Sequence, residues 1–166
     1  MAPFTHLHVH SSYSLLGGTA TVEELAQRAA SDCLSHLALT DSNALYGIVA
    51  FERACRAAGV VPITGMVVRV ALPADLAART APGLQPGELV LLATGPAGYR
   101  SLCRLSAGLQ ARPDREARVA RGLSLDDLRA EHDGLLCLEG GRRGWVAPLL
   151  AAGDARTAHR YTGRLA

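Results

Sequence analysis

Short apolar segments alternate with amphipathic helical patterns along most of this chain, and no other feature constrains its fold as strongly. Strand-like segments cover residues 4–10, 36–40, 60–63, 67–72, 88–94 and 134–139. Helical patterns lie between them, and a last helical region begins near Val146. Strands that alternate with helices at this spacing imply βαβ units and a parallel sheet or barrel. We therefore predict an α/β fold with a single core, for which 166 residues are sufficient.

Local signals indicate where several helices begin and end. Thr21 followed by Glu24 forms a capping-box pattern, and Ser124 stands in front of a short acidic helical segment that it can cap. A helix predicted over residues 48–58 ends at Gly59, because glycine adopts the left-handed conformation of a C-terminal cap most readily.

Loops between the strands are expected to bring polar residues together. Gly65 separates two strand-like segments and indicates a bulge or a tight turn, while residues 73–87 read as a surface excursion rich in proline. Ligands gather at the carboxyl ends of parallel strands. His8 and His10 close the first predicted strand and Asp41 closes the second, so we expect them to face one common mouth with Gly65.

Three histidines stand at alternating positions near the N-terminus. His6, His8 and His10 would project from one face of a strand, since side chains repeat every two residues there. Neutral imidazole is the commonest protein metal ligand, and two histidines on one strand can hold a single ion. We expect His6 to pack or form hydrogen bonds at the start of the strand rather than to bind metal.

Charge excludes strong nonspecific binding to nucleic acid. Seventeen Lys and Arg residues against fifteen Asp and Glu residues leave a net charge of +2, which is too small for bulk attraction to phosphates. Arginines gather between residues 112 and 129, but acidic residues interrupt them. We interpret this segment as a solvated surface of mixed charge rather than a phosphate-binding face.

The cysteines carry no metal or redox motif. Cys33, Cys55, Cys103 and Cys137 are widely spaced without a C-x-x-C pair, which argues against a zinc ribbon. We expect four buried, reduced thiols in a cytoplasmic protein. The sequence has no secretory signal pattern and no apolar run of membrane-spanning length.

Four ordered motifs resemble one known family over nearly the whole chain. They lie at residues 6–16 (HLHVHSSYSLL), 38–47 (ALTDSNALYG), 57–65 (AAGVVPITG) and 91–105. They are similar to the PHP (polymerase and histidinol phosphatase) domain, and more narrowly to the N-terminal PHP domain of bacterial C-family DNA polymerases. That group comprises the DNA polymerase III alpha subunit and error-prone DNA polymerase. The resemblance implies a distorted (β/α) barrel, with residues 1–166 as its N-terminal portion and the family pattern continuing beyond Ala166.

The resemblance carries only part of the family's metal site onto this chain. Two histidine ligands fall on His8 and His10, and an aspartate of the second motif remains as Asp41. The family's other early ligands, an aspartate, a histidine and a bridging glutamate, fall on Gly17, Ser42 and Val67. A multinuclear phosphoesterase needs a bridging carboxylate to hold its ions close together. The later Asp-x-His ligands would lie beyond residue 166. We therefore expect His8, His10 and Asp41 to be a remnant metal site, at which Zn²⁺ or Mn²⁺ are the ions to test, with no catalytic residue. The alternative for Asp41 is that it satisfies the amides of a turn, as aspartate often does.

The resemblance favours a structural role, with two alternatives. In the first reading the chain is a PHP module of a C-family polymerase, of the error-prone class. It would support the rest of the polymerase and dock replication or mutagenesis accessory proteins in DNA replication or repair, meeting DNA only indirectly and no membrane. The first alternative is an active metal-dependent phosphoesterase or 3′–5′ exonuclease, with Asn43 or Thr64 as replacement ligands. The second is a truncated remnant of a polymerase gene, with an open sheet edge.

Overall fold

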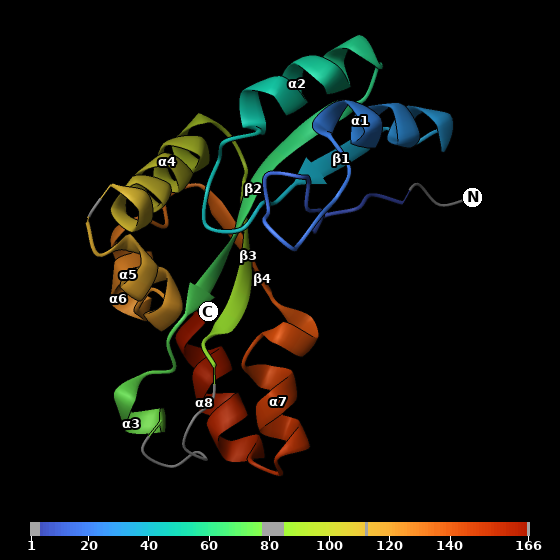
Figure 1. Cartoon of the computed structure of the whole chain (residues 1–166). Helices are drawn as coiled ribbons and strands as arrows, with labels where there is room; N and C mark the ends of the chain where they lie inside the picture. The colour runs from blue at the N-terminus through green and yellow to red at the C-terminus, as the bar shows by residue number, and fades with distance from the viewer. Residues whose placement is uncertain (1–3, 78–84, 112, 166) are drawn as a thin grey trace.

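Four strands form one mixed sheet through the middle of the molecule. The computed structural model describes residues 4–77, 85–111 and 113–165. The strands follow the order β1 (His36–Leu39), β2 (Val61–Val70), β3 (Gly87–Ala93) and β4 (Leu135–Glu139) (Figure 1). β1 and β2 run parallel, whereas β3 runs antiparallel to both β2 and β4. The prediction of an α/β fold is confirmed, but the prediction of an all-parallel sheet is wrong.

The direction of β3 follows from the connection that precedes it. A parallel neighbour needs a crossover that returns the chain to the starting edge, most often along a helix. Residues 71–86 contain, in their described part, only the four-residue helix α3 (Ala74–Ala77). Strand β3 therefore turns back beside β2. The predicted surface excursion over residues 73–87 lies partly outside the described residues, and Leu76 within it is fully buried.

β2 is one continuous strand, which corrects the expected break at Gly65. Its first half, as far as Thr64, pairs with β1, and its second half, from Gly65 to Val70, pairs with β3. A Cβ added at Gly65 would lie 2.7 Å from the carbonyl oxygen of Leu91 and 2.8 Å from Cγ2 of Thr40. Glycine is needed here because two backbones approach closely where the strand changes partners.

The N-terminal segment is extended but is not a regular strand, contrary to the prediction for residues 4–10. A single parallel bridge joins His6 to Leu37. Further along, the Thr40 N–H donates to the Val9 carbonyl at 2.8 Å, while the Val9 N–H donates to the Thr40 hydroxyl at 2.9 Å. The threonine side chain thus replaces a backbone partner and interrupts the ladder.

Two helices cover the β1 end of the sheet. α1 (Val22–Ser31) begins with the predicted capping box, in which Thr21 and Glu24 exchange hydrogen bonds of 2.8 and 3.2 Å. α2 (Ile48–Ala57) is followed by Gly59 at φ +73°, which confirms the predicted left-handed cap. The two helices enclose a small core with β1, which includes Val22, Ala26, Ala29, Leu37, Leu39, Phe51 and Cys55.

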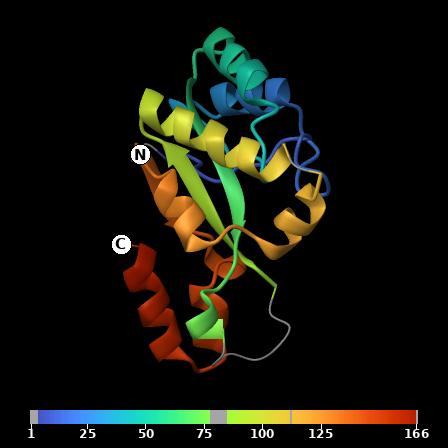
Figure 2. The ribbon, with the colours of Figure 1, turned by 90° about the vertical axis from the view of Figure 1, so that its left-hand side faces the viewer.

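The larger core lies between β2, β3 and the later helices. These are α4 (Pro96–Gln110), α5 (Arg115–Arg121), α6 (Leu125–Ala130), the 3₁₀ turn η1 (Gly141–Arg143), α7 (Val146–Ala151) and α8 (Ala155–Leu165). Figure 2 shows α4 lying across one face of the sheet, while α7 and α8 pack beside each other at the far end. The buried residues of this larger core include Met66, Val68, Leu89, Leu102, Leu105, Trp145 and Tyr161.

The cysteines differ from expectation in their burial. Only Cys55 is buried, while Cys33 and Cys137 are exposed and Cys103 is half-buried, all four as free thiols. Cys33 lies in the turn after α1 at φ +55°, and Cys137 lies on β4, which pairs with β3 alone among the described strands. Within the described residues, no helix has the length and apolar character that crossing a membrane requires.

Candidate functional site

His8 and His10 lie side by side at the end of the extended N-terminal segment. Their Nε2 atoms are 3.1 Å apart, and their rings meet edge to face with centroids separated by 5.1 Å. His8 is exposed and His10 is half-buried. His6 packs edge to face against Phe4 with ring centroids 4.7 Å apart.

Hydrogen bonds around Ser14 determine the tautomer of His10. The Ser14 hydroxyl donates to Asp41 Oδ1 at 2.6 Å, so its oxygen is left to accept from the Ser42 N–H at 3.0 Å and from His10 Nδ1 at 3.0 Å. His10 therefore carries its proton on Nδ1 when it is neutral, and its Nε2 presents a lone pair to His8. In the neutral pair the hydrogen bond at 3.1 Å runs from His8 to His10.

Burial and neighbouring charge keep His10 neutral. Burial lowers the pKa of His10, and the positive charge of His8 adds to this effect, while Asp41 and Glu88 oppose it. Arg143 lowers the pKa of His10 further. A group with a lowered pKa in this range is uncharged at neutral pH.

Asp41 is buried, and both of its carboxylate oxygens accept hydrogen bonds from the loop that follows the histidines. Only 3% of this residue is exposed. Oδ1 accepts from the Ser11 N–H at 2.8 Å and from the Ser14 hydroxyl at 2.6 Å, and Oδ2 accepts from the Ser11 hydroxyl at 2.7 Å. These bonds tie the 11–14 loop to the end of β1, in the manner of an aspartate that satisfies turn donors.

The positions aligned with the family's other ligands also lie close to the histidines and Asp41. A Cβ added at Gly17 would lie 3.0 Å from Ser14 Cβ and 3.8 Å from His10 Cγ. Ser42 and Val67 face each other across a parallel bridge, and the Val67 N–H donates to the Asp41 carbonyl at 3.1 Å. His10, Asp41 and Val67 thus belong to one network of contacts at the ends of these segments.

Of the two alternative ligands, Asn43 has its side-chain oxygen engaged in a hydrogen bond. The side-chain oxygen of Asn43 accepts a hydrogen bond from the Arg69 backbone N–H at 3.4 Å, and the backbone carbonyl of Asn43 accepts one from the Gln110 side chain at 3.0 Å. Thr64 is half-buried in β2 opposite Leu39. Val67 itself is buried, in a small apolar cluster with Ala38, Val90 and Leu92.

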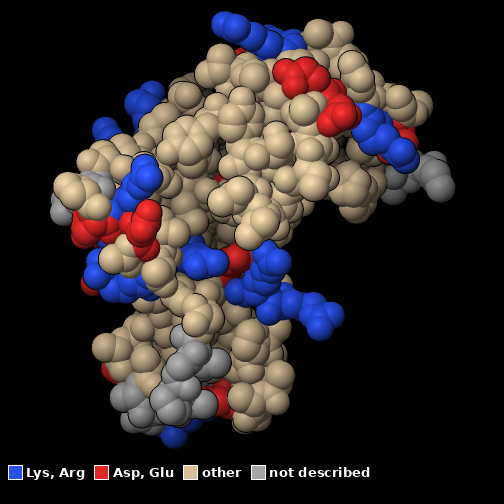
Figure 3. Space-filling view, viewed as in Figure 1, with Lys and Arg blue, Asp and Glu red and all other residues tan. Residues whose placement is uncertain are grey.

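A cavity of about 440 Å³ near His10 was not anticipated from the sequence. Arg69, Arg142 and Arg143 line it together with Glu88. The Glu88 Oε2 atom is buried without a hydrogen-bond partner, and the guanidinium of Arg143 lies 3.9 Å from it. Figure 3 shows basic atoms gathered around an acidic one at the narrow middle of the molecule. The basic turn Gly-Gly-Arg-Arg-Gly at residues 140–144 was the available sequence signal.

The fold and the family model define the class of protein. The PHP domain model matches residues 6–166, and the chain belongs to the PHP domain family. The chain aligns with an amidohydrolase structure from Chromobacterium violaceum at a TM-score of 0.56 and 18% identity, over 93% of this chain and 74% of that one. It also aligns with the structure of a Bifidobacterium adolescentis protein described as a metal-dependent phosphoesterase, at a TM-score of 0.50 and 17% identity, over 100% of this chain and 56% of that one. These likenesses concern the fold, and the open sheet is consistent with an incomplete distorted barrel.

Within this family the chain is similar to parts of bacterial DNA polymerases. It is 36% identical over 150 residues to the DNA polymerase III subunit alpha of Bacillus subtilis, which covers 90% of this chain and 12% of that protein. It is 34% identical over 177 residues to the error-prone DNA polymerase of Symbiobacterium thermophilum, which covers 98% of this chain and 15% of that protein. The chain thus spans between 12% and 15% of the length of these relatives.

Proposed function

We propose that residues 1–166 are a PHP module of a bacterial C-family DNA polymerase, of the error-prone class, which holds no catalytic metal and acts as a structural element. In this proposal it supports the polymerase body and docks accessory proteins of replication or repair in the cytoplasm. It meets DNA only through those partners. Similarity to both polymerase types, at 34–36% identity, supports the assignment to this branch of the family.

The engagement of Asp41 is the observation that carries the proposal. Three donors from Ser11 and Ser14 occupy its two oxygens, so the carboxylate has little capacity left for an ion. A catalytic zinc site takes three protein ligands, and a structural site takes four. In the part of the chain that the structure describes, no group of three or more His, Cys, Asp or Glu residues is placed to hold a metal. The donor set therefore does not fit the family's multinuclear centre.

Charge around the histidine pair supports the same conclusion. Burial is the main cause of the lowered pKa of His10, and Arg143 adds a smaller effect in the same direction. Arg69 and Arg142 line the same cavity as Arg143. Guanidinium groups are always charged and repel a divalent cation. Among the described residues, Glu88 is the one carboxylate that lines this cavity with the three arginines, so it offsets only part of their positive charge. We propose His8, His10 and Asp41 as the remnant of a site rather than a working one.

An exposed apolar surface fits the docking role. Leu15 is 90% exposed and Leu16 is 99% exposed, and Leu16 is held at φ +59°, which is costly for a leucine. Tyr13 packs next to Gly47, since a Cβ added there would lie 2.7 Å from its ring, and Tyr46 beside it is 65% exposed. We propose the remainder of the polymerase chain as the occupant of this surface, because the curated relatives extend far beyond the length matched here.

An activity assay tests the proposal. The chain is incubated with a generic phosphate monoester and with 3′-labelled single-stranded DNA, in Mn²⁺ or Zn²⁺, beside the His8→Ala/His10→Ala double variant. We expect no turnover above that of the variant. Turnover that the double substitution abolishes would refute the structural role.

That contrary result would instead favour a metal-dependent phosphoesterase or exonuclease. The separation of 3.1 Å between the two Nε2 atoms supports this second candidate, because two imidazoles that bind one ion at ~2.0–2.1 Å lie about that far apart. Zn²⁺ or Mn²⁺ would then be held by His8 and His10 with water completing the shell.

A third reading, a truncated remnant of a polymerase gene, is supported by the outer edge of β4. Among the described strands β4 pairs only with β3, and Leu136 on it is 45% exposed. Edges of this kind promote association between chains. A soluble, monomeric chain that unfolds cooperatively would contradict this reading.

A further inference from the structure

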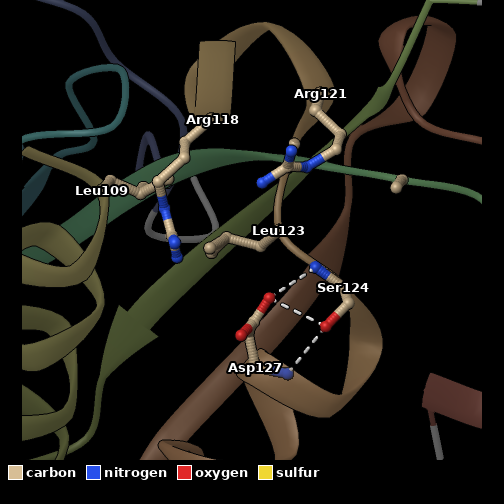
Figure 4. A pocket seen from close by; sticks show the side chains of 8 residues that line it. Leu109, Arg118, Arg121, Leu123, Ser124 and Asp127 are labelled. Carbon is tan, nitrogen blue, oxygen red and sulfur yellow. Dashed lines mark hydrogen bonds between the residues drawn. The ribbon is translucent and has the colours of Figure 1, made fainter. Parts of the chain in front are cut away.

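A second cavity, of about 320 Å³, lies away from the histidine pair between α4, α5 and α6. Leu109 and Leu123 form apolar walls, and Arg118 and Arg121 line it from α5 (Figure 4). Its volume is at the lower end of the ~300–1,000 Å³ typical of small-molecule sites. The cavity therefore has room for a small ligand with one apolar side.

Arg118 and Arg121 bring two positive charges to this cavity from one face of α5. Residues three apart on a helix are neighbours on its surface. Figure 4 shows the guanidinium group of Arg121 turned toward Arg118, above Leu123. Two fixed cations that face one cavity repel each other, and an anion placed between them would relieve that repulsion.

Neither guanidinium has a carboxylate partner in the described chain. No ion pair within 4.0 Å is formed there by Arg118 or by Arg121, although Arg104, Arg129 and Arg164 all form one. The Nε atom of Arg118 is buried and has no hydrogen-bond partner. A buried donor without an acceptor is costly, and native structures contain few of them.

One oxygen of the single carboxylate that lines the cavity is held by Ser124. Asp127 Oδ2 accepts from the Ser124 N–H at 2.9 Å and from the Ser124 hydroxyl at 2.8 Å, which completes the predicted cap of α6. Burial tends to raise the pKa of Asp127, but the Ser124 hydrogen bonds and the charges of Arg118 and Arg121 hold it below its usual value. The two arginines therefore share one carboxylate, that of Asp127, which is already hydrogen-bonded to Ser124.

We propose that this cavity is a phosphate-binding site, in which Arg118 and Arg121 grip the phosphate group of a small organic phosphate. The planar guanidinium fork matches phosphate oxygens in a bidentate manner, and the buried Arg118 Nε gains its missing acceptor. Leu109 and Leu123 contact the group attached to the phosphate. The site revises the interpretation of residues 112–129 as a purely solvated surface. It does not depend on the proposed structural role, because it shares no residue with the histidine region.

Calorimetric titration of the full 166-residue chain tests this site. The probes are pyrophosphate, a deoxymononucleotide and a short single-stranded oligodeoxynucleotide. We expect Arg118→Gln and Arg121→Gln each to weaken binding by roughly tenfold or more, the effect of losing a hydrogen bond to a charged group. Arg115→Gln removes the same charge from the same helix outside the cavity and should change binding less than twofold.

The three probes separate the sources of the phosphate. Binding of the mononucleotide with the same arginine dependence supports a small organic phosphate as the ligand, whereas binding of the oligonucleotide alone would overturn that assignment in favour of a nucleic-acid backbone. The proposal is overturned if no probe binds with a Kd below roughly 10 mM. It is also overturned if Arg115→Gln weakens binding as much as Arg118→Gln and Arg121→Gln do.

A spectroscopic measurement keeps the test independent of folding defects. The Arg118 Nε–H resonance in a ¹⁵N-labelled chain should shift on addition of the bound probe, whereas that of Arg115 should not. If Arg118→Gln prevents folding, Arg121→Gln decides the matter, because Arg121 is exposed. An unshifted Arg118 resonance at saturating probe contradicts the site.

Discussion

The hydroxyl of Ser14 donates a hydrogen bond of 2.6 Å to the carboxylate of Asp41, and through this contact the histidine pair is anchored to the sheet. Ser14 also accepts a hydrogen bond from His10 Nδ1 at 3.0 Å, so one side chain links His10 to the Asp41 carboxylate, whose two oxygens accept three hydrogen bonds in all. Asp41 acts here as the structural centre of the loop.

Replacing Asp41 should therefore destabilise the fold. Asp41→Ala leaves two hydroxyls and one N–H of Ser11 and Ser14 without their acceptor, and we expect a loss of about 3 kcal/mol in the free energy of unfolding. Urea denaturation measures it. Asp32→Ala is the matched control, because that carboxylate pairs with Arg28 on the surface and should cost less than about 1 kcal/mol. Equal effects of the two substitutions would contradict this role of Asp41.

Two glycines should respond in opposite directions to the same substitution. Gly65→Ala places a Cβ against the Leu91 carbonyl and should cost about 1–3 kcal/mol. Gly108→Ala in α4 meets no atom within 4 Å and should stabilise the helix by about 0.5–1 kcal/mol. Thermal unfolding of both variants measures the difference. A tolerated Gly65→Ala would show that β2 and β3 approach less closely than the structure has them.

Alkaline pH should destabilise the chain through Cys55. Burial raises the pKa of this thiol to about 11 from 9.0. The unfolded chain ionises the thiol at the lower value and the folded chain does not, so stability is intact below pH 9 and falls between pH 9 and 11, by roughly 2–3 kcal/mol at the upper end. Denaturation curves at several pH values, compared with those of Cys55→Ala, isolate the effect. A pH dependence that is identical in the variant would rule it out.

The exposed leucines should matter for association and not for folding. Leu15→Ser/Leu16→Ser alters side chains that are 90% and 99% exposed, so we expect the melting temperature to stay within about 2 °C. Under the proposed function the same variant should bind a polymerase body that lacks this module at least tenfold more weakly. Leu150→Ser, 52% exposed on α7, is the control and should bind normally. Undiminished binding by the double variant would remove this surface from the proposal.

Local signals in the sequence predicted local structure well. The capping pair of Thr21 and Glu24 and the left-handed cap at Gly59 depend on neighbours within one turn, and both are present. Ser124 caps α6 as expected. These features follow from hydrogen bonds that a few consecutive residues can form among themselves, so no tertiary information is needed to find them.

Features that depend on distant segments were predicted less well. The direction of β3 follows from how its connection packs, and Gly65 is required by the backbone of Leu91, which lies 26 positions further along the chain. The 4–10 segment has the alternation of a strand, but the Thr40 hydroxyl interrupts its pairing. Glu88 and Arg143 near His10 come from different elements, and no spacing rule connects them.

The candidate site stays a prediction, and only part of its arrangement follows from the sequence. His10 and Asp41 are linked through Ser14, and Ser42 and Val67 lie beside Asp41, but no group of three His, Cys, Asp or Glu residues in the described chain is placed to hold a metal. That Asp41 satisfies turn donors was one of the two readings of this residue, but the identity of the donors, Ser11 and Ser14, could not be predicted, because serines in a loop can point in many directions.

Metal binding at the histidine pair tests the central claim most directly. The chain is titrated with Zn²⁺ and separately with Mn²⁺ by calorimetry at neutral pH, beside the His8→Ala/His10→Ala variant. With two imidazoles and an engaged Asp41, we predict no stoichiometric binding tighter than about 10 µM and little difference from the variant. Binding of one or more ions per chain with submicromolar affinity, lost in the variant, would contradict the account.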